Sequence, residues 1–373
     1  MKPWLLRSAI LHALLACAAV ASVPARADEE QVLNVYNWGD YIADDTIRNF
    51  EKETGIKVRY DLFDSNEALH AKLVAGMSGY DVVVPGSHFA KMQIQAGLLQ
   101  KLDKSKIPNL ANLDPAIQAQ LAKMDPGNDY LVDWLWGYTT VGINADKAKK
   151  ALGSLPMPDN AWDLVFKPEY MSKLKSCGVS FLDTPSEILP IALKYLGKDP
   201  RSKDPADYKA AGEMLKAVRP YVTRFSGSGS DYIDQMAKGQ LCAVIGWSGD
   251  IMIAKDKSNK AHNPQNLEVL LPKMGGLLFF DTMAIPKDAK HKENAYKWIN
   301  YILRPEVDAS LTNKVFYANP NKAAMKFVDP ALAKNKAVFP DAARLAGMIA
   351  PDTPDQATLR LVTRTFTNFK ANR

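Results

Sequence analysis

The chain contains 373 residues, 47% of them hydrophobic and 24% charged, and its formal net charge is +6. This length predicts two domains of about 150 residues each, with enough apolar residues for ordinary cores. The excess of basic residues is small, so the charge does not indicate a nucleic-acid-binding protein.

The first 27 residues have the layout of a secretory signal peptide. Lys2 and Arg7 make a basic start, residues 8–20 are almost uncharged and apolar, and small residues stand at Ala25 and Ala27. This pattern predicts export to the periplasm and cleavage after Ala27. A membrane anchor is the alternative, but an apolar stretch of roughly 13 residues is shorter than the roughly 20 that a spanning helix needs.

The rest of the chain is expected to be soluble and nearly neutral. Without residues 1–27 the net charge falls from +6 to +3, because that segment holds three basic residues and no acidic one. No later run approaches the roughly 18 uncharged apolar residues of a membrane span. A second kind of processing stays open, because residues 14–17 loosely match a lipoprotein signal that would place a lipid on Cys17.

The mature chain opens with strands that alternate with helices. The predicted elements are a strand at 32–38, a helix at 44–54, a strand at 57–63, a helix at 66–77 and a strand at 81–85. Leu69, Leu73 and Met77 are spaced by four residues and should form the buried face of the second helix. The alternation predicts a parallel sheet with helices on both faces. Ligands of such sheets bind beyond the carboxyl ends of the strands, where Trp38 and the loop after Val84 lie.

The same α/β pattern continues to the C-terminal half. The predicted elements are a long strand at 133–145 that passes into a second lobe, a helix at 231–238, strands at 241–247 and 279–286, and a helix at 292–303. Ala295, Ile299, Ile302 and Leu303 should face the core in the last helix. The glycine-rich run at 226–230 lacks the lysine of a phosphate-binding loop, and we expect it to be a flexible loop.

Six blocks, in order along nearly the whole mature chain, resemble the periplasmic putrescine-binding family. They are YNWGDYI (36–42), FEKETGIKV (50–58), DSNE (64–67), SCGVSFLD (176–183), AVIGWSGD (243–250) and VFYAN (315–319). The resemblance implies an α/β, two-lobed, type II periplasmic-binding-protein-like fold with a ligand cleft at the hinge. Lobe one would comprise 28–138 and 275–304, and lobe two 139–274 and 305–373. The resemblance further implies a monomer without a cofactor, which would deliver its polyamine to the permease of an ABC importer in the inner membrane.

The resemblance also implies a set of ligand-binding residues. They are the aromatic walls Trp38, Trp247, Phe279 and Tyr317, the carboxylates Glu187, Asp250 and Asp281, and Asp40 and Tyr41 at the edge of the cleft. A diamine is an apolar rod with an ammonium group at each end, so carboxylates suit its ends and aromatic faces suit its middle. Structural alternatives stay open, because aromatic residues after strands are often core residues and Asp250 could cap a helix after Gly249.

Two positions differ from the family pattern and leave the preferred amine open. Gly39 replaces the usual serine after the first tryptophan, and His88 stands where a serine would face the ligand. Neutral His88 could accept a hydrogen bond from an ammonium group, and nearby carboxylates would raise its pKa. Otherwise His88 turns to solvent or packs on Phe89. Spermidine, cadaverine and agmatine are therefore alternatives to putrescine.

Cys177 and Cys242 remain after processing and, in an oxidising compartment, are expected to form a disulfide rather than two buried thiols. Neither shows a redox spacing, and the five histidines show no metal-ligand spacing, so no metal is expected. Two other classes of function stay open. One is a secreted enzyme that uses Glu187, Asp250 and Asp281 as acid–base groups, although no catalytic motif is present. The other is a ferric-ion-binding protein that uses tyrosines.

Overall fold

Two β-sheets organise the part of the chain that the computed structural model describes, residues 29–350 and 352–372. The predicted signal peptide and Cys17 lie outside the described residues. The first sheet has the order β2-β1-β3, and the second has the order β6-β5-β7-β4-β8 with β9 also paired to β4. The strands are β1 Val32–Trp38, β2 Lys57–Phe63, β3 Val82–Val83, β4 Val132–Asn144, β5 Val179–Leu182, β6 Arg224–Ser226, β7 Ala243–Trp247, β8 Leu267–Val269 and β9 Leu277–Met283.

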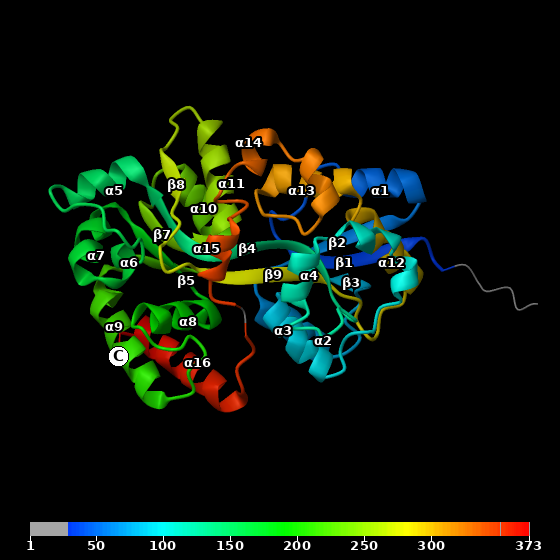
Figure 1. Cartoon of the computed structure of the whole chain (residues 1–373), viewed down its shortest axis with the longest axis horizontal. Helices are drawn as coiled ribbons and strands as arrows, with labels where there is room; N and C mark the ends of the chain where they lie inside the picture. The colour runs from blue at the N-terminus through cyan, green and yellow to red at the C-terminus, as the bar shows by residue number, and fades with distance from the viewer. Residues whose placement is uncertain (1–28, 351, 373) are drawn as a thin grey trace, which may run out of the picture. The chain divides into compact units, whose positions relative to one another are not determined.

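Helices surround both sheets (Figure 1). The α-helices are α1 Thr46–Thr54, α2 Asn66–Val74, α3 Ser87–Gln95, α4 Pro115–Leu121, α5 Ala145–Leu152, α6 Asp163–Phe166, α7 Pro168–Leu174, α8 Pro185–Tyr195, α9 Pro205–Val218, α10 Gly229–Ala237, α11 Ser248–Asn259, α12 Lys292–Ile302, α13 Pro305–Val315, α14 Pro330–Ala333, α15 Ala342–Ala346 and α16 Gln356–Lys370. Short 3₁₀ helices are η1 Lys104–Lys106, η2 Pro108–Asn112, η3 Lys175–Cys177, η4 Arg219–Tyr221 and η5 Lys322–Lys326. None of these described helices is long and apolar enough to cross a membrane.

The first sheet confirms the strand predictions in the N-terminal part. β1 pairs in parallel with β2 and β3, and Trp38 lies opposite Phe63 at the carboxyl ends of β1 and β2. The helix predicted at 44–54 is α1, which ends at Gly55 in the left-handed conformation. Glycine adopts this conformation without steric cost, so it is the usual residue at this position. Local sequence signals therefore predicted the strand limits that place Trp38 at the edge of this sheet.

Helix α2 is shorter than predicted, and the expectation for Met77 was wrong. Leu69 and Leu73 are buried as expected, but the helix ends at Val74 and Met77 is 92% exposed. Gly76 and Met77 both have positive φ angles, 73° and 47°. The chain leaves the helix axis at that point, so the four-residue spacing no longer keeps Met77 on the buried face.

The second sheet is mixed rather than purely parallel. β5 runs parallel to β6 and β7, whereas β4 pairs antiparallel with β7, β8 and β9. All 13 residues of β4 are buried. Figure 1 shows β4 and β9 running side by side across the middle of the picture, between the strands of the first sheet and the other strands of the second. This pair brings Phe279 and Asp281 of β9 close to the first sheet.

The glycine-rich run at 226–230 is not an irregular loop. Ser226 ends β6, Ser228 caps α10, and Gly229 begins that helix. Ser228 and Asp231 form a reciprocal capping box, in which each side chain accepts a hydrogen bond from the other residue's backbone. Such a box satisfies two amide groups that the first turn of a helix leaves free. The capping box therefore orders this segment.

Helix α12 confirms the predicted inward face. Ala295, Ile299, Ile302 and Leu303 are all fully buried, and Pro305 begins the next helix, α13. Figure 1 shows α13 close to α1, and the Arg304 guanidinium before α13 binds the Glu53 carboxylate of α1 with an N–O distance of 2.7 Å. Helix α13 thus begins beside the first sheet.

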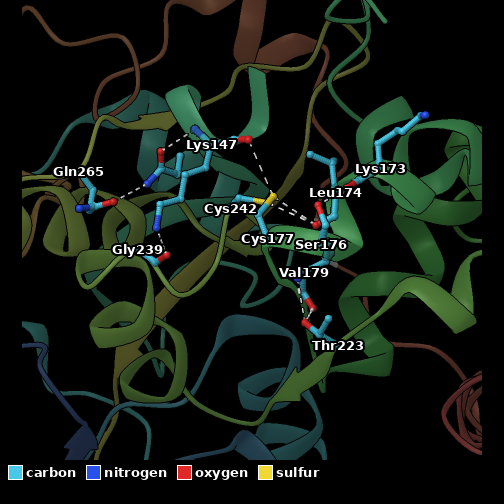
Figure 2. Close-up of a disulfide and its surroundings, with 11 residues drawn as sticks. Lys147, Lys173, Leu174, Ser176, Cys177, Val179, Thr223, Gly239, Cys242 and Gln265 are labelled. Atoms are coloured by element: carbon cyan, nitrogen blue, oxygen red, sulfur yellow. Dashed lines mark hydrogen bonds between the residues drawn. A yellow bond between two sulfur atoms is a disulfide. The ribbon is translucent and has the colours of Figure 1, made fainter. Parts of the chain in front are cut away.

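The predicted disulfide between Cys177 and Cys242 is present, with Cα atoms 5.5 Å apart (Figure 2). Cys177 ends η3, and Cys242 directly precedes β7. The bond closes a loop with a sequence separation of 65 residues. It ties two segments that continue into the site described next, through α8 and β7.

Candidate ligand-binding site

A pocket lies where the carboxyl ends of β1 and β2 meet β9, β7 and the first turns of α8, α10 and α11. Its lining residues are Trp38, Gly39, Tyr41, Phe63, Asp64, Asn66, Gly86, His88, Glu187, Ser228, Gly229, Ser230, Ile233, Trp247, Asp250, Phe279, Asp281 and Tyr317. Every ligand-binding residue predicted from the sequence lines this pocket except Asp40. The Asp40 carboxylate lies at the edge, where it accepts a hydrogen bond from the Ser230 hydroxyl at 3.1 Å.

Two tryptophans are held in place by hydrogen bonds from their indole nitrogens. The Nε1 atom of Trp38 donates to the carbonyl oxygen of Val84 at 2.9 Å, and its ring packs against Phe63 with centroids 4.4 Å apart. The Nε1 atom of Trp247 donates to Glu187 Oε2 at 3.0 Å. Each indole therefore presents its ring at a defined position in the pocket wall.

Asp281 projects from the middle of β9 and is only 7% exposed. Its Oδ2 atom accepts a hydrogen bond from the Tyr41 hydroxyl at 3.0 Å. Burial raises the pKa of Asp281 to about 8, against the hydrogen bond from Tyr41, and the charges of Glu187 and Asp250 add to the rise. The carboxyl group thus binds a proton near neutral pH as long as no cation is close to it.

Glu187 lies in the first turn of α8, which starts at Pro185. The hydroxyl of Thr139 in β4 and the indole of Trp247 both donate to its carboxylate. Burial raises the pKa of Glu187 to about 7, although the two hydrogen bonds lower it. Strand β4 was predicted from the sequence, but the role of its Thr139 was not.

Asp250 lies in the first turn of α11 and does not cap that helix, because the N-cap residue is Trp247. The alternative of a capping role was therefore wrong. The hydroxyls of Tyr317 and Tyr232 donate to the two oxygens of Asp250 at 2.6 and 3.0 Å. Burial raises the pKa of Asp250 to about 6, while the two tyrosines lower it.

Two glycines make room for this arrangement. A Cβ atom at Gly249 would lie 2.3 Å from the ring of Tyr317, and one at Gly229 would lie 2.0 Å from Asp250 Oδ2. Both distances are far below van der Waals contact. Gly229, the first residue of α10, therefore contributes to the site by allowing α10 to approach Asp250.

His88 lies in the first turn of α3 and lines the pocket, as predicted. Its ring also packs on Phe89 with centroids 4.9 Å apart, so His88 makes the packing contact that was the alternative to lining the pocket. The expectation that carboxylates raise its pKa was wrong. Burial lowers the pKa of His88 to about 4, because desolvation disfavours the charged imidazole. His88, Glu187 and Phe279 also border a second cavity of about 630 Å³.

The sequence analysis missed several residues that line the pocket or hold its lining in place. Tyr232 is fully buried, binds Asp250 and accepts a hydrogen bond from the Trp247 amide at 2.8 Å. No local pattern distinguishes it from a core tyrosine. Asp64 and Asn66 also line the pocket. They belong to the block DSNE (64–67), and its resemblance to the family was the sequence signal that could have identified them.

The pocket has a negative electrostatic character. Four carboxyl groups line it, those of Asp64, Glu187, Asp250 and Asp281, and no lysine or arginine belongs to its described lining. Buried carboxylates without a cation are costly, so a bound cation would be strongly favoured. The hydroxyls of Tyr41 and Tyr317 already donate to carboxylates, which does not favour a tyrosine-bound ferric ion. Within residues 29–350 and 352–372, no group of three or more acidic, histidine or cysteine side chains could hold a metal ion.

The fold and the site agree with comparisons with known proteins. The PotD substrate-binding protein of a spermidine/putrescine ABC transporter from Streptococcus pneumoniae superposes with a TM-score of 0.75 and 29% identity, over 92% of this chain and 99% of the other. The fold is therefore that of the type II periplasmic binding proteins, as predicted.

Residues 45–340 match the family model described as bacterial extracellular solute-binding protein, and the chain belongs to this family. The putrescine-binding periplasmic protein PotF of Escherichia coli is 46% identical over 365 residues, 97% of this chain and 98% of that protein. The putrescine-binding periplasmic protein SpuD of Pseudomonas aeruginosa is 47% identical over 364 residues, with the same coverage.

Proposed function

We propose that this chain is a periplasmic receptor that binds a polyamine, with putrescine as the first candidate, and delivers it to the permease of an ABC importer. The names of relatives that are 46% and 47% identical over almost the whole chain support this assignment. Export would use residues 1–27 as a signal peptide cleaved after Ala27. The receptor would act as a monomer without a cofactor.

The observation that carries the proposal is a pocket with buried carboxyl groups, aromatic walls and no described lysine or arginine in its lining. Asp281 and Asp250 would each receive an ammonium group, and Glu187 would add negative charge beside Trp247. Trp38, Trp247, Phe279 and Tyr317 would enclose the methylene groups and offer their ring faces to the cations. The tyrosine hydroxyls that bind Asp250 and Asp281 would hold these carboxylates in position for the ligand.

The raised pKa values of the three carboxyl groups support a cationic ligand. Asp281, Glu187 and Asp250 have pKa values of about 8, 7 and 6 in the ligand-free pocket, so together they retain protons near neutral pH. A diamine brings two positive charges to the same place. Binding would therefore exchange protons for ammonium groups, with a net release of protons.

Two lobes that close on the ligand would complete the mechanism. We infer the boundaries stated from the sequence, 28–138 with 275–304 and 139–274 with 305–373, with β4 and β9 as crossing strands between them. Closure about these strands would bury the amine and present a surface for the permease. These boundaries and the motion remain predictions.

The test is titration calorimetry of the mature chain with putrescine, cadaverine, agmatine and spermidine. We expect at least one amine to bind reversibly, and Asp281→Asn to abolish most of the heat. The matched control is Asp159→Asn, which removes a carboxylate that is 94% exposed and paired with Lys273 at the surface. Absence of binding by all four amines would contradict the proposal.

An enzyme that uses the same carboxyl groups is the alternative from another class. Mass spectrometry of the amine after prolonged incubation separates the two functions, because a receptor returns its ligand unchanged. Gly39 and His88, the two departures from the family pattern, both line the pocket, and they leave the preferred amine open. Cadaverine, agmatine and spermidine therefore stay in the same screen as putrescine.

A further inference from the structure

The second cavity, of about 630 Å³, adjoins the ligand pocket. His88, Glu187 and Phe279 line both cavities, so these three residues form the boundary between them. None of the other described residues that line the second cavity belongs to the pocket. They come mainly from α3, from the start of α8, from residues 200–208 and from α16. A ligand longer than the pocket therefore has space to extend past this boundary.

The boundary lies beside Asp281. The backbone of Gly86 pairs with that of Asp281 in an isolated antiparallel bridge. A Cβ atom at Gly86 would lie 3.4 Å from Cε1 of His88, so the imidazole lies against this glycine. Phe279 precedes Asp281 by two residues in β9 and lies on the same face of the strand. The ammonium group that Asp281 would receive is therefore the one nearest to the second cavity.

The opposite end of the pocket, at Asp250, leaves less space for an extension. A Cβ atom at Gly229 would lie 2.0 Å from Asp250 Oδ2, so the first turn of α10 packs directly against this carboxylate. The hydroxyls of Tyr317 and Tyr232 already donate to its two oxygens. A bound amine with a third ammonium group is therefore expected to extend past Asp281 into the second cavity.

The two cavities differ in charge. The ligand pocket is lined by four carboxyl groups and by no described lysine or arginine. The second cavity is lined by three cationic side chains, those of Lys91, Arg201 and Lys203. Its carboxylates beyond the boundary are already paired, Asp355 with Lys203 at 2.8 Å and Asp352 with Arg201 at 3.9 Å. A third ammonium group would therefore meet carboxylates that already have cationic partners.

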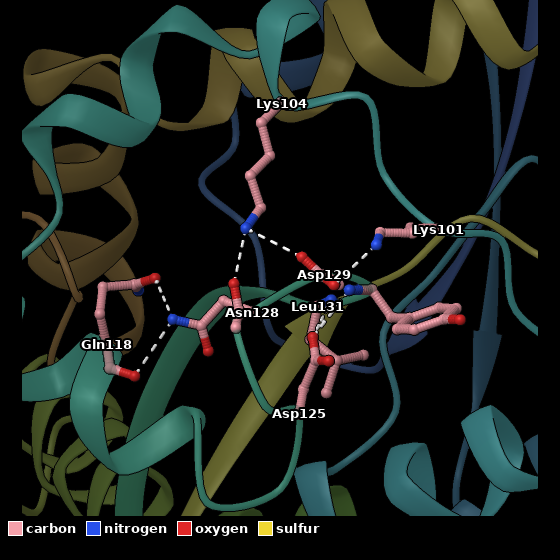
Figure 3. A network of polar contacts seen from close by, with 9 residues as sticks. Lys101, Lys104, Gln118, Asp125, Asn128, Asp129 and Leu131 are labelled. Carbon is pink, nitrogen blue, oxygen red and sulfur yellow. Dashed lines mark hydrogen bonds and ion pairs between the residues drawn. The ribbon is translucent and has the colours of Figure 1, made fainter.

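Lys91 has no carboxylate partner among residues 29–350 and 352–372. Lys101 and Lys104, by contrast, both bind the Asp129 carboxylate, with N–O distances of 2.9 and 3.2 Å (Figure 3). Lys91 follows His88 by three residues on α3, and residues at this spacing are neighbours on a helix surface. The positive charge of Lys91 is therefore close to the boundary and is not compensated by a described carboxylate.

We propose that Lys91 is a specificity-determining residue, which acts from the second cavity against amines that carry a third ammonium group. This inference rests on the proposed function and deepens it, because it names the amines that the site favours, diamines over triamines. Lys91 does not line the ligand pocket, so it acts on the bound amine through its charge. Water and salt screen such a repulsion, so its effect is a several-fold change in affinity that is largest at low salt.

Titration calorimetry with putrescine and spermidine at low ionic strength tests this role. Lys91→Glu should raise the affinity for spermidine about fivefold and change the affinity for putrescine by less than about twofold. Added salt should shrink the gain, because salt screens the charge, whereas a change in packing would not respond in this way. The matched control is Lys297→Glu, which makes the same change in net charge at an exposed position of α12 outside both cavities. The control should bind both amines like the wild type.

A matched ligand separates the effect of charge from that of length. N-butylputrescine has the length of spermidine but ends in a methyl group in place of the third ammonium group, so its affinity should not respond to Lys91→Glu. An equal gain for N-butylputrescine would overturn the proposal. The same ratio of spermidine to putrescine affinity in the wild type and Lys91→Glu would also overturn it, with the proposed function intact. Failure of every amine to bind would instead contradict the proposed function and this inference together.

Discussion

At the scale of single residues, the pocket carboxyl groups accept hydrogen bonds from neutral donors, and no lysine or arginine belongs to the described lining. Tyr41 donates to Asp281, and Tyr317 and Tyr232 donate to Asp250. These neutral donors orient the carboxylates and leave their charge available. Most of the carboxylates were identified from the sequence by resemblance, whereas Tyr232 was not, because its contact with Asp250 crosses from α10 to α11.

The first prediction concerns Asp281. Replacing Asp281 by Ala should weaken polyamine binding by about 2–5 kcal/mol, because one ammonium group would then be buried without its counter-charge. The unliganded protein should fold normally, because the Asp281 carboxylate lines a pocket and forms no ion pair with another described side chain. If calorimetry shows that Asp281→Ala binds the polyamine with near-native affinity, Asp281 is not a ligand-binding residue.

The second prediction concerns the contact between Gly249 and Tyr317. A Cβ atom at Gly249 would lie 2.3 Å from the Tyr317 ring, so Gly249→Ala should displace the ring and lower ligand affinity at least tenfold. Gly227→Ala is the matched control, because its Cβ would meet no atom closer than 3.9 Å. The control should bind like the wild type. Equal affinities of both variants would show that the position of Tyr317 is unimportant for binding.

At the scale of elements, the ligand residues sit at the ends of strands and in the first turns of helices. β1 ends at Trp38, β7 ends at Trp247, and Glu187 and Asp250 occupy the first turns of α8 and α11. The disulfide joins the segments just before β5 and β7 and thereby supports two of these ends. Their arrangement follows the general rule that open α/β sheets bind ligands beyond the carboxyl ends of their strands.

The third prediction concerns this disulfide. Replacing Cys177 and Cys242 by Ser should lower the free energy of unfolding by at most about 4 kcal/mol, because the unfolded chain regains the freedom of a long loop. Thermal unfolding with and without a reductant measures the effect. The double variant should not respond to the reductant, whereas the wild type should lose stability. Two free thiols found by mass spectrometry in protein from the periplasm would contradict the bond.

At the scale of the whole molecule, ligand binding and protonation are coupled through several groups at once. The pocket carboxyls, with pKa values of about 8, 7 and 6, titrate between pH 5 and 9, whereas His88, with a pKa of about 4, remains neutral there. The pH dependence of the pocket therefore belongs to the carboxyl groups and not to His88. Their folded pKa values are raised, so the ligand-free protein loses stability as the pH rises from about 4 to 8.

The fourth prediction is the pH dependence of binding. Affinity for a diamine should fall as the pH decreases from 8 to 5.5, because protons then compete with the ammonium groups for the carboxylates. Calorimetry in two buffers of different ionisation enthalpy should detect proton release at pH 7. His88→Ser should show the same slope as the wild type at constant ionic strength. If affinity depends more steeply on pH in the wild type than in His88→Ser, His88 contributes to the pH dependence of binding.

The sequence by itself determined the strand and helix order, the disulfide and the class of ligand, because these depend on periodicity, caps and blocks of residues that are contiguous in the chain. β1 and β2 match their predicted limits, and the Met77 error came from a left-handed turn that a spacing rule does not detect. Only the tertiary structure decided how strongly each carboxyl group holds its proton. The pKa of each carboxyl group depends on its burial and on the charges of residues distant in the chain, and neither burial nor a distant charge leaves a pattern in the local sequence. Asp133 and Asp308 are two examples.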